Sequence, residues 1–270
     1  MNSSQLPITR NLNLAYALSL VITLLLAGLS LGGLLYQSRL YPTGEMRQSF
    51  VANDVVNLLI GLPILLGSMW LTRRGQLVGL LLWPGALLYV LYNYIACVFG
   101  IPFGLISWAY LALAGLSTYV IYELVKGLEG QSVRERLFGV VPVKISGWIL
   151  IVFGVAFFFR AVGVIAQASL DGTRLPASEI GVLIADLVLS MPMVVGGAWL
   201  LRRMPLGYVS GLGLLFAASM LFIGLIVFLL LQPVLTAAPF SPVDVIVVFI
   251  MGLVCFIPFV LFLRAVASTG

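Results

Sequence analysis

The residues that could carry chemistry in this chain are a few polar side chains set within long apolar segments. Asp54 lies in the stretch FVANDVVN, three residues before Asn57 and next to Asn53. Spacings of three and four residues place Asp54, Asn57 and Asn53 on one face of a helix. A carboxylate beside amide oxygens can bind a hard cation or exchange a proton. Four more polar residues near the same membrane surface complete the hypothetical ligand-binding site: Glu45, Tyr89, Tyr92 and Asn93.

A second pair of ionisable residues lies within apolar segments of the C-terminal part. Arg160 and Asp186 fall at similar depth, about 10–14 Å from the nearer membrane surface by helical rise. A lone charge is unfavourable in the bilayer, so a base and an acid at one depth predict a buried salt bridge. We interpret this pair as structural, with a role in gating or proton coupling as the alternative.

Several classes of chemistry are excluded by composition. The chain has no histidine, which removes imidazole general bases, histidine-dependent nucleophiles and nearly all zinc sites. Its two cysteines, Cys97 and Cys255, are expected at different depths and therefore unpaired. We expect no catalytic residue, no metal centre and no cofactor.

The elements that position these residues are predicted by hydropathy. Of 270 residues, 62% are hydrophobic and 9% charged, and the mean hydropathy is +1.17. Soluble domains are about 45–50% apolar and about 25% charged, and a helix needs about 20 apolar residues to cross a bilayer. The sequence therefore predicts an all-α polytopic membrane helix bundle with eight transmembrane helices. The expected spans are 12–36, 50–71, 76–96, 103–125, 144–169, 179–201, 205–231 and 243–266.

A tandem repeat relates the two parts of the chain. Residues 57–77 match residues 186–206 at eight of 21 positions, including a shared proline, glycine, tryptophan and arginine pair. Because each copy holds four spans, the repeats should enter the membrane in the same direction. We predict a four-helix half at 1–125, a cytoplasmic linker at 126–143 and a second half at 144–270. Pro63 and Pro192 are expected to kink their helices.

The basic residues predict the orientation. Ten of the 14 fall on the side of both termini: Arg10, Arg73, Arg74, Lys126, Arg134, Arg136, Lys144, Arg202, Arg203 and Arg264. Arg39, Arg47 and Arg174 fall on the opposite side. The positive-inside rule then places both termini in the cytoplasm. The net charge of +5 thus reflects topology, and we expect a lipid bilayer and no nucleic acid as partner.

The combination of NDVV (53–56), Pro63, RRG (73–75), LYNY (91–94) and FGIPF (99–103) resembles an uncharacterised group of multi-pass prokaryotic membrane proteins. The resemblance covers mainly the first half. It implies a location in the prokaryotic cytoplasmic (inner) membrane and carries no activity.

Three function hypotheses follow. The first is a carrier or channel for a small solute or ion, with an outward-facing polar site in the first half. The second is a non-transporting membrane protein that binds lipid, assists assembly or serves as a partner subunit. The third is an intramembrane enzyme acting on a lipid, with Asp54 and Glu45 as acid and base or as Mg²⁺ ligands. The oligomeric state and any protein partner are left open.

Overall fold

The computed structural model describes residues 6–235 and 239–269, and within these residues the fold is all-helical. Eight helical segments are long and apolar enough to cross a membrane, which confirms the predicted multi-pass bundle. One span is built from three consecutive pieces, α3 (Gly44–Val56), η1 (Asn57–Gly61) and α4 (Leu62–Arg73). The other seven are α1 (Asn13–Leu35), α5 (Leu77–Gly100), α6 (Ser107–Gly127), α8 (Val143–Leu170), α9 (Ala177–Leu201), α10 (Pro205–Leu235) and α11 (Pro242–Ala267).

Two of the eight spans begin four or more residues away from the predicted start. The second span begins at Gly44 and not at residue 50, because the side chain of Thr43 caps it by accepting a hydrogen bond from the Met46 amide at 3.1 Å. The fourth span begins at Ser107 and not at residue 103, and the Ser107 hydroxyl accepts a hydrogen bond from the Gly104 amide. The Thr43 cap, which hydropathy does not detect, decides the first of these starts, whereas no side chain caps the second.

A π-helix interrupts the second span at η1, directly before Pro63. A proline lacks the N–H that would bond to the carbonyl four residues earlier. Here the Leu62 amide bonds to the Asn57 carbonyl, one residue further back than in an α-helix. The helical turn that precedes Pro63 is therefore wider than an α-helical turn. By contrast, α9 continues as one α-helix through Pro192. The two matched prolines therefore lie in different local structures, and the kinks remain predictions.

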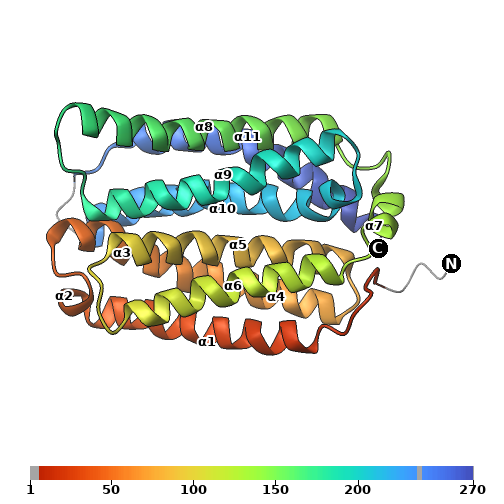
Figure 1. Cartoon of the computed structure of the whole chain (residues 1–270), viewed down its shortest axis with the longest axis horizontal. Helices are drawn as coiled ribbons and strands as arrows, with labels where there is room; N and C mark the ends of the chain where they lie inside the picture. The colour runs from red at the N-terminus through yellow and green to blue at the C-terminus, as the bar shows by residue number, and fades with distance from the viewer. Residues whose placement is uncertain (1–5, 236–238, 270) are drawn as a thin grey trace.

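The helices form two groups (Figure 1). In this view the first half, α1–α6, lies below, and the second half, α8–α11, lies above. Both termini and the short helix α7 (Gly130–Leu137) lie at one end of the bundle, called here the termini end. The short helix α2 (Gln37–Leu40) lies at the opposite end, the α2 end. Helix α7 lies within the linker and packs at the termini end, where Gly130 is close to Pro205 at the start of α10.

The two halves meet closely where α5 crosses α10. A Cβ atom at Gly213 would lie 3.0 Å from the Leu81 carbonyl oxygen and 3.1 Å from the Gly85 nitrogen. A Cβ atom at Gly85 would collide with the backbone of Gly213. The backbones therefore touch at this crossing, as small residues allow in membrane helices.

Matched glycines also join neighbouring helices within each half. Gly79 of α5 packs against Thr72 of α4, and Gly207 of α10 packs against Leu200 of α9. Gly79 and Gly207 are 128 residues apart, as are Gly85 and Gly213. These equivalent contacts support the tandem repeat, which stays a prediction.

Candidate functional site

Asp54 lies in α3 and is buried against α1, with 6% of its surface exposed. Its Oδ2 atom accepts a hydrogen bond from the Tyr41 hydroxyl at 2.7 Å. Gly33 of α1 makes room for this contact. A Cβ atom there would collide with the Asp54 carboxylate and would lie 2.7 Å from the Tyr41 hydroxyl. The carboxylate therefore occupies space that only a glycine on the neighbouring helix leaves free.

Tyr41 lies in the segment between α2 and α3, and its buried side chain contacts Asp54 near the α2 end of the bundle. Its side chain is 2% exposed, and its ring stacks on Phe50 with the centroids 5.5 Å apart. Burial raises the pKa of the Tyr41 hydroxyl, and the nearby Asp54 carboxyl and Cys97 thiol raise it further. The hydroxyl thus keeps its proton and remains a donor to Asp54.

Two more hydroxyl groups extend this cluster, because Ser30 lies beside the carboxylate and Tyr94 lies beside Ser30. Ser30 of α1 is fully buried near Asp54 and Tyr94, yet its Oγ atom makes no hydrogen bond of regular geometry. Tyr94 of α5 is 2% exposed, and its ring packs 5.8 Å from the ring of Tyr110. We call Ser30, Tyr41, Asp54 and Tyr94 the Asp54 cluster. Within the described residues no lysine or arginine pairs with Asp54, so its neighbours are neutral.

A second polar group lies deeper in the first half. Asn57 begins the π-helix, and its Oδ1 atom accepts a hydrogen bond from the Tyr89 hydroxyl at 3.3 Å. Asn93 donates from Nδ2 to the Tyr89 carbonyl oxygen at 2.9 Å. Tyr89 thus links Asn57 through its hydroxyl and Asn93 through its backbone carbonyl, and among the described hydrogen bonds none joins these residues to Asp54.

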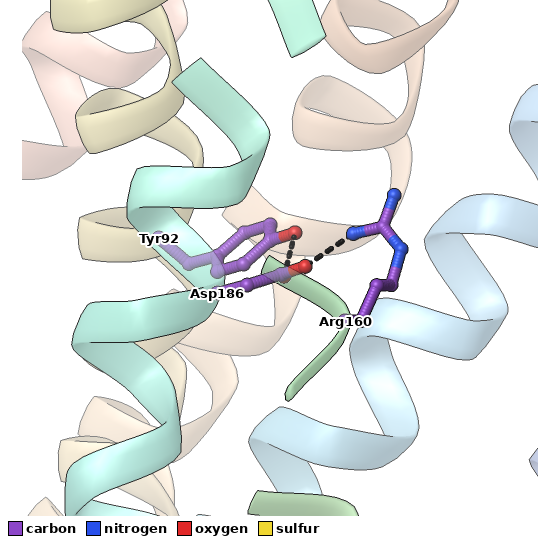
Figure 2. Close-up of polar contacts among 3 residues, drawn as sticks. All are labelled: Tyr92, Arg160 and Asp186. Carbon is purple, nitrogen blue, oxygen red and sulfur yellow. Dashed lines mark hydrogen bonds and ion pairs between the residues drawn. The ribbon is translucent and has the colours of Figure 1, made fainter. Parts of the chain in front are cut away.

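A third polar group joins the two halves (Figure 2). The Tyr92 hydroxyl of α5 donates to Asp186 Oδ1 of α9 at 3.0 Å, and Arg160 of α8 forms an ion pair with Asp186 Oδ2. Asp186 is 2% exposed, whereas the side chain of Arg160 is 49% exposed. The predicted ion pair between Arg160 and Asp186 is therefore present, and it is buried only on its acidic side.

The remaining two predicted site residues also lie outside the Asp54 cluster. Glu45 accepts a hydrogen bond from Ser178 at the start of α9. It lies nine residues before Asp54 in the same helix, a rise of about 13 Å. Asn53 is half-buried. One site was expected to gather six residues around Asp54, and the structure instead divides them into separate groups: Glu45, Asn53, Asn57, Tyr89, Tyr92 and Asn93.

Sequence reasoning missed the residues that do surround Asp54. Tyr41 lies in a connecting segment, and nothing in its spacing relates it to residue 54. Ser30 had a usable signal, because Ser19, Thr23 and Ser30 form a polar stripe along α1. Ser19 and Thr23 have other partners, since Ser19 accepts from the Trp83 indole at 3.0 Å and Thr23 donates to the Ser19 carbonyl. Ser30 alone of the three is left facing the carboxylate.

The described residues hold no group of three or more histidine, cysteine, aspartate or glutamate side chains placed to bind a metal ion. The arrangement around Asp54 supplies one carboxylate and three hydroxyl groups. Comparison of the chain with protein-family models, with curated proteins and with solved structures finds no match.

Proposed function

We propose that this multi-pass membrane protein is a carrier for a small cation, with the proton as the best-fitting ion, and that Asp54 is the exchange site. The observation that carries the proposal is the difference between the two acids buried in the bundle. Asp186 has Arg160 as its counter-ion, whereas Asp54 is held by the neutral hydroxyl of Tyr41. An acidic side chain in a membrane interior marks an ion pathway by default.

The chemistry of the cluster suits reversible binding of a single positive charge. An ionised carboxylate away from water and from basic groups is strongly disfavoured, so Asp54 needs a proton or a cation to neutralise it. The hydroxyl of Ser30 lies beside it and can serve as an oxygen partner, and the hydroxyl of Tyr94 lies beside Ser30. Metal ions such as Ca²⁺ take six to eight oxygen ligands, more than the cluster supplies, which favours the proton.

The backbone next to the cluster also supports the proposal. The π-helix at Asn57–Gly61 begins three residues after Asp54. Such segments occur mostly as single turns inside α-helices and are frequent at functional sites. A change between π and α hydrogen bonding would rotate α3 relative to α4 and so shift Asp54 relative to Gly33 of α1 and to Tyr41.

The test is ion flux in liposomes that contain the purified protein and a pH-sensitive dye. The wild type should dissipate an imposed proton gradient, and Asp54→Asn, which keeps the shape and the acceptor for Tyr41, should abolish this flux. Asp171→Asn removes an exposed acid at the same end of the bundle and should leave the flux unchanged. Wild-type liposomes that carry protons, Na⁺ and K⁺ no faster than protein-free liposomes would overturn the proposal.

A second candidate, a non-transporting membrane protein, is favoured by the packing between the halves. In proteins with parallel repeats the ligand site often lies between the repeats. Here the contact of Gly85 with Gly213 brings the backbones together at that position. Native mass spectrometry in mild detergent tests this candidate, which predicts a stoichiometric protein or lipid partner in a preparation without ion flux.

A further inference from the structure

The segment from Tyr36 to Gly44 connects α1 with α3 at the α2 end of the bundle (Figure 1). It contains α2, which is a single helical turn of four residues. Within this segment Tyr41 alone is buried, and the other residues are exposed or half-buried. The backbone of the segment therefore lies at the surface of the bundle, and one tyrosine side chain points from it into the interior.

The Tyr41 side chain lies between this surface segment and the Asp54 carboxylate. Its hydroxyl donates to Asp54 Oδ2 at 2.7 Å, and its ring stacks on Phe50. The other two members of the cluster, Ser30 and Tyr94, come from the spans α1 and α5. Tyr41 is thus the one member of the Asp54 cluster that comes from a connecting segment. The carboxylate lies one tyrosine side chain below the surface of the α2 end.

The other sides of the carboxylate are closely packed. On the side of α1, a Cβ atom at Gly33 would collide with the carboxylate, so the helix backbone itself covers Asp54 there. Ser30 is fully buried, and Tyr94 is 2% exposed. The shortest way from water at the α2 end to the carboxylate therefore passes the Tyr41 side chain.

The segment can move without unwinding its neighbours. Helix α1 ends before Tyr36 and α2 begins after it, so the helical ladder is already broken at this residue. The Tyr41 amide bonds to the Gln37 carbonyl at 2.7 Å, which joins Tyr41 to the α2 turn. On the other side, the Thr43 cap holds the start of α3. Exposed segments with few buried contacts open at low free-energy cost.

We propose that Tyr41 is the gate that separates Asp54 from water at the α2 end. The gate rests on the proposed function, in which Asp54 is the exchange site, and adds the element that controls access to it. Withdrawal of Tyr41 with the α2 turn exposes the carboxyl group for exchange, and its return excludes water. A carboxyl oxygen accepts the hydroxyl bond whether the group is ionised or protonated, so the gate closes over the empty and the loaded site.

The test measures how fast a reagent dissolved in water reaches Asp54. The protein in lipid nanodiscs is treated with the water-soluble carbodiimide EDC and ethanolamine, which together convert carboxyl groups to amides. Peptide mass spectrometry then gives a rate for each acid. Exposed Asp171 should react fast in every variant, and Asp186, at 2% exposure, serves as the buried reference.

Three tyrosine variants test the gate. Tyr41→Phe keeps a ring beside Phe50 but loses the hydroxyl, and should raise the Asp54 rate about threefold to tenfold, the equivalent of one hydrogen bond. Tyr41→Ala also removes the ring and should raise the rate further. Tyr208→Phe is the matched control, because Tyr208 is 1% exposed and lies near the start of α10 at the termini end. It should keep the wild-type rate at Asp54.

The rate at Asp186 separates opening of the gate from loss of the fold. If Tyr41→Ala disturbs the whole bundle, Asp186 also reacts faster, and Tyr41→Phe then decides. A Tyr41→Phe variant that labels Asp54 at the wild-type rate would overturn the gate, as would a Tyr41→Ala variant with unchanged rates at both acids. Labelling needs no ion gradient. Wild-type liposomes without ion flux would therefore refute the carrier, whereas unchanged labelling in a protein that carries ions would refute the gate alone.

Discussion

Asp54 and Asp186 show how one residue type acquires two roles from its neighbours. Both are buried at 6% exposure or less, and both accept a hydrogen bond from a tyrosine hydroxyl. They differ in the presence of a basic partner, because Arg160 reaches Asp186 and no lysine or arginine in the described chain reaches Asp54. A paired acid stabilises the fold only while its partner stays, whereas an unpaired buried acid needs a proton or a cation to neutralise it.

The ion pair gives a prediction at this scale. Arg160→Gln leaves Asp186 buried without a counter-ion and should destabilise the protein by about 1–3 kcal/mol. A fully buried pair would lose roughly 3–5 kcal/mol, and the exposed half of Arg160 reduces the effect. Arg160→Gln/Asp186→Asn should recover part of the loss, because the carboxylate is then replaced by a neutral amide. Melting curves in detergent measure both, and a double variant less stable than the single one would contradict this account.

The residue scale also shows where sequence reasoning stops. Tyr89 and Tyr92 are three positions apart, and helical spacing alone places them on one face. In the structure Tyr89 donates to Asn57 in its own half, and Tyr92 donates to Asp186 in the other half. Spacing predicts which residues of one helix are neighbours. It does not predict which helix each of them meets, because α5 has partners on several sides.

Among the elements, the contact between α1 and α3 positions Asp54. Two helices can approach this closely only where one of them lacks a side chain, and Gly33 provides that gap opposite the carboxylate and the Tyr41 hydroxyl. The sequence contains Gly33 among 28 glycines, and nothing in its spacing separates it from Gly28. The two glycines differ because α3 places Asp54 against Gly33 and places nothing within 4 Å of a Cβ atom at Gly28.

Two alanine substitutions on α1 test this contact. Gly33→Ala should displace the carboxylate from Tyr41, destabilise the protein by about 1–3 kcal/mol through overpacking, and impair ion flux. Gly28→Ala is the matched control, because its Cβ atom would meet nothing within 4 Å. Thermal melting and the liposome assay measure both variants. Equal behaviour of the two would show that α1 does not hold Asp54 in place.

At the scale of the whole molecule, the spans were predictable and their packing was not. A long apolar run indicates that a helix lies in lipid, so all eight spans could be located from hydropathy. The start at Gly44 was missed because the first turn, GEMRQS, is polar and depends on the Thr43 cap. The crossing of α5 and α10 was missed because a glycine contact carries no hydropathy signal.

The crossing of the halves gives its own prediction. Gly85→Ala places a methyl group against the Gly213 backbone and should lower the melting temperature, because backbone cannot move aside as a flexible side chain can. Gly115→Ala on α6 meets nothing within 4 Å and should have little effect. A Gly85→Ala variant that melts like the wild type would mean that the halves do not rely on this contact.

The orientation of the whole molecule follows from its ends and can be tested by labelling. Both termini and α7 lie at one end of the bundle, the end that holds ten of the basic residues of the chain. The positive-inside rule then predicts that this end faces the cytoplasm. Gln131→Cys in α7 and Thr173→Cys at the α2 end place exposed thiols on opposite sides, while the native Cys97 and Cys255 are buried and should react slowly. In intact bacterial cells a membrane-impermeant maleimide should label Thr173→Cys at once and Gln131→Cys only after the membrane is opened. Labelling in the reverse order would show that the protein has the opposite orientation, with the Asp54 cluster near the cytoplasmic surface.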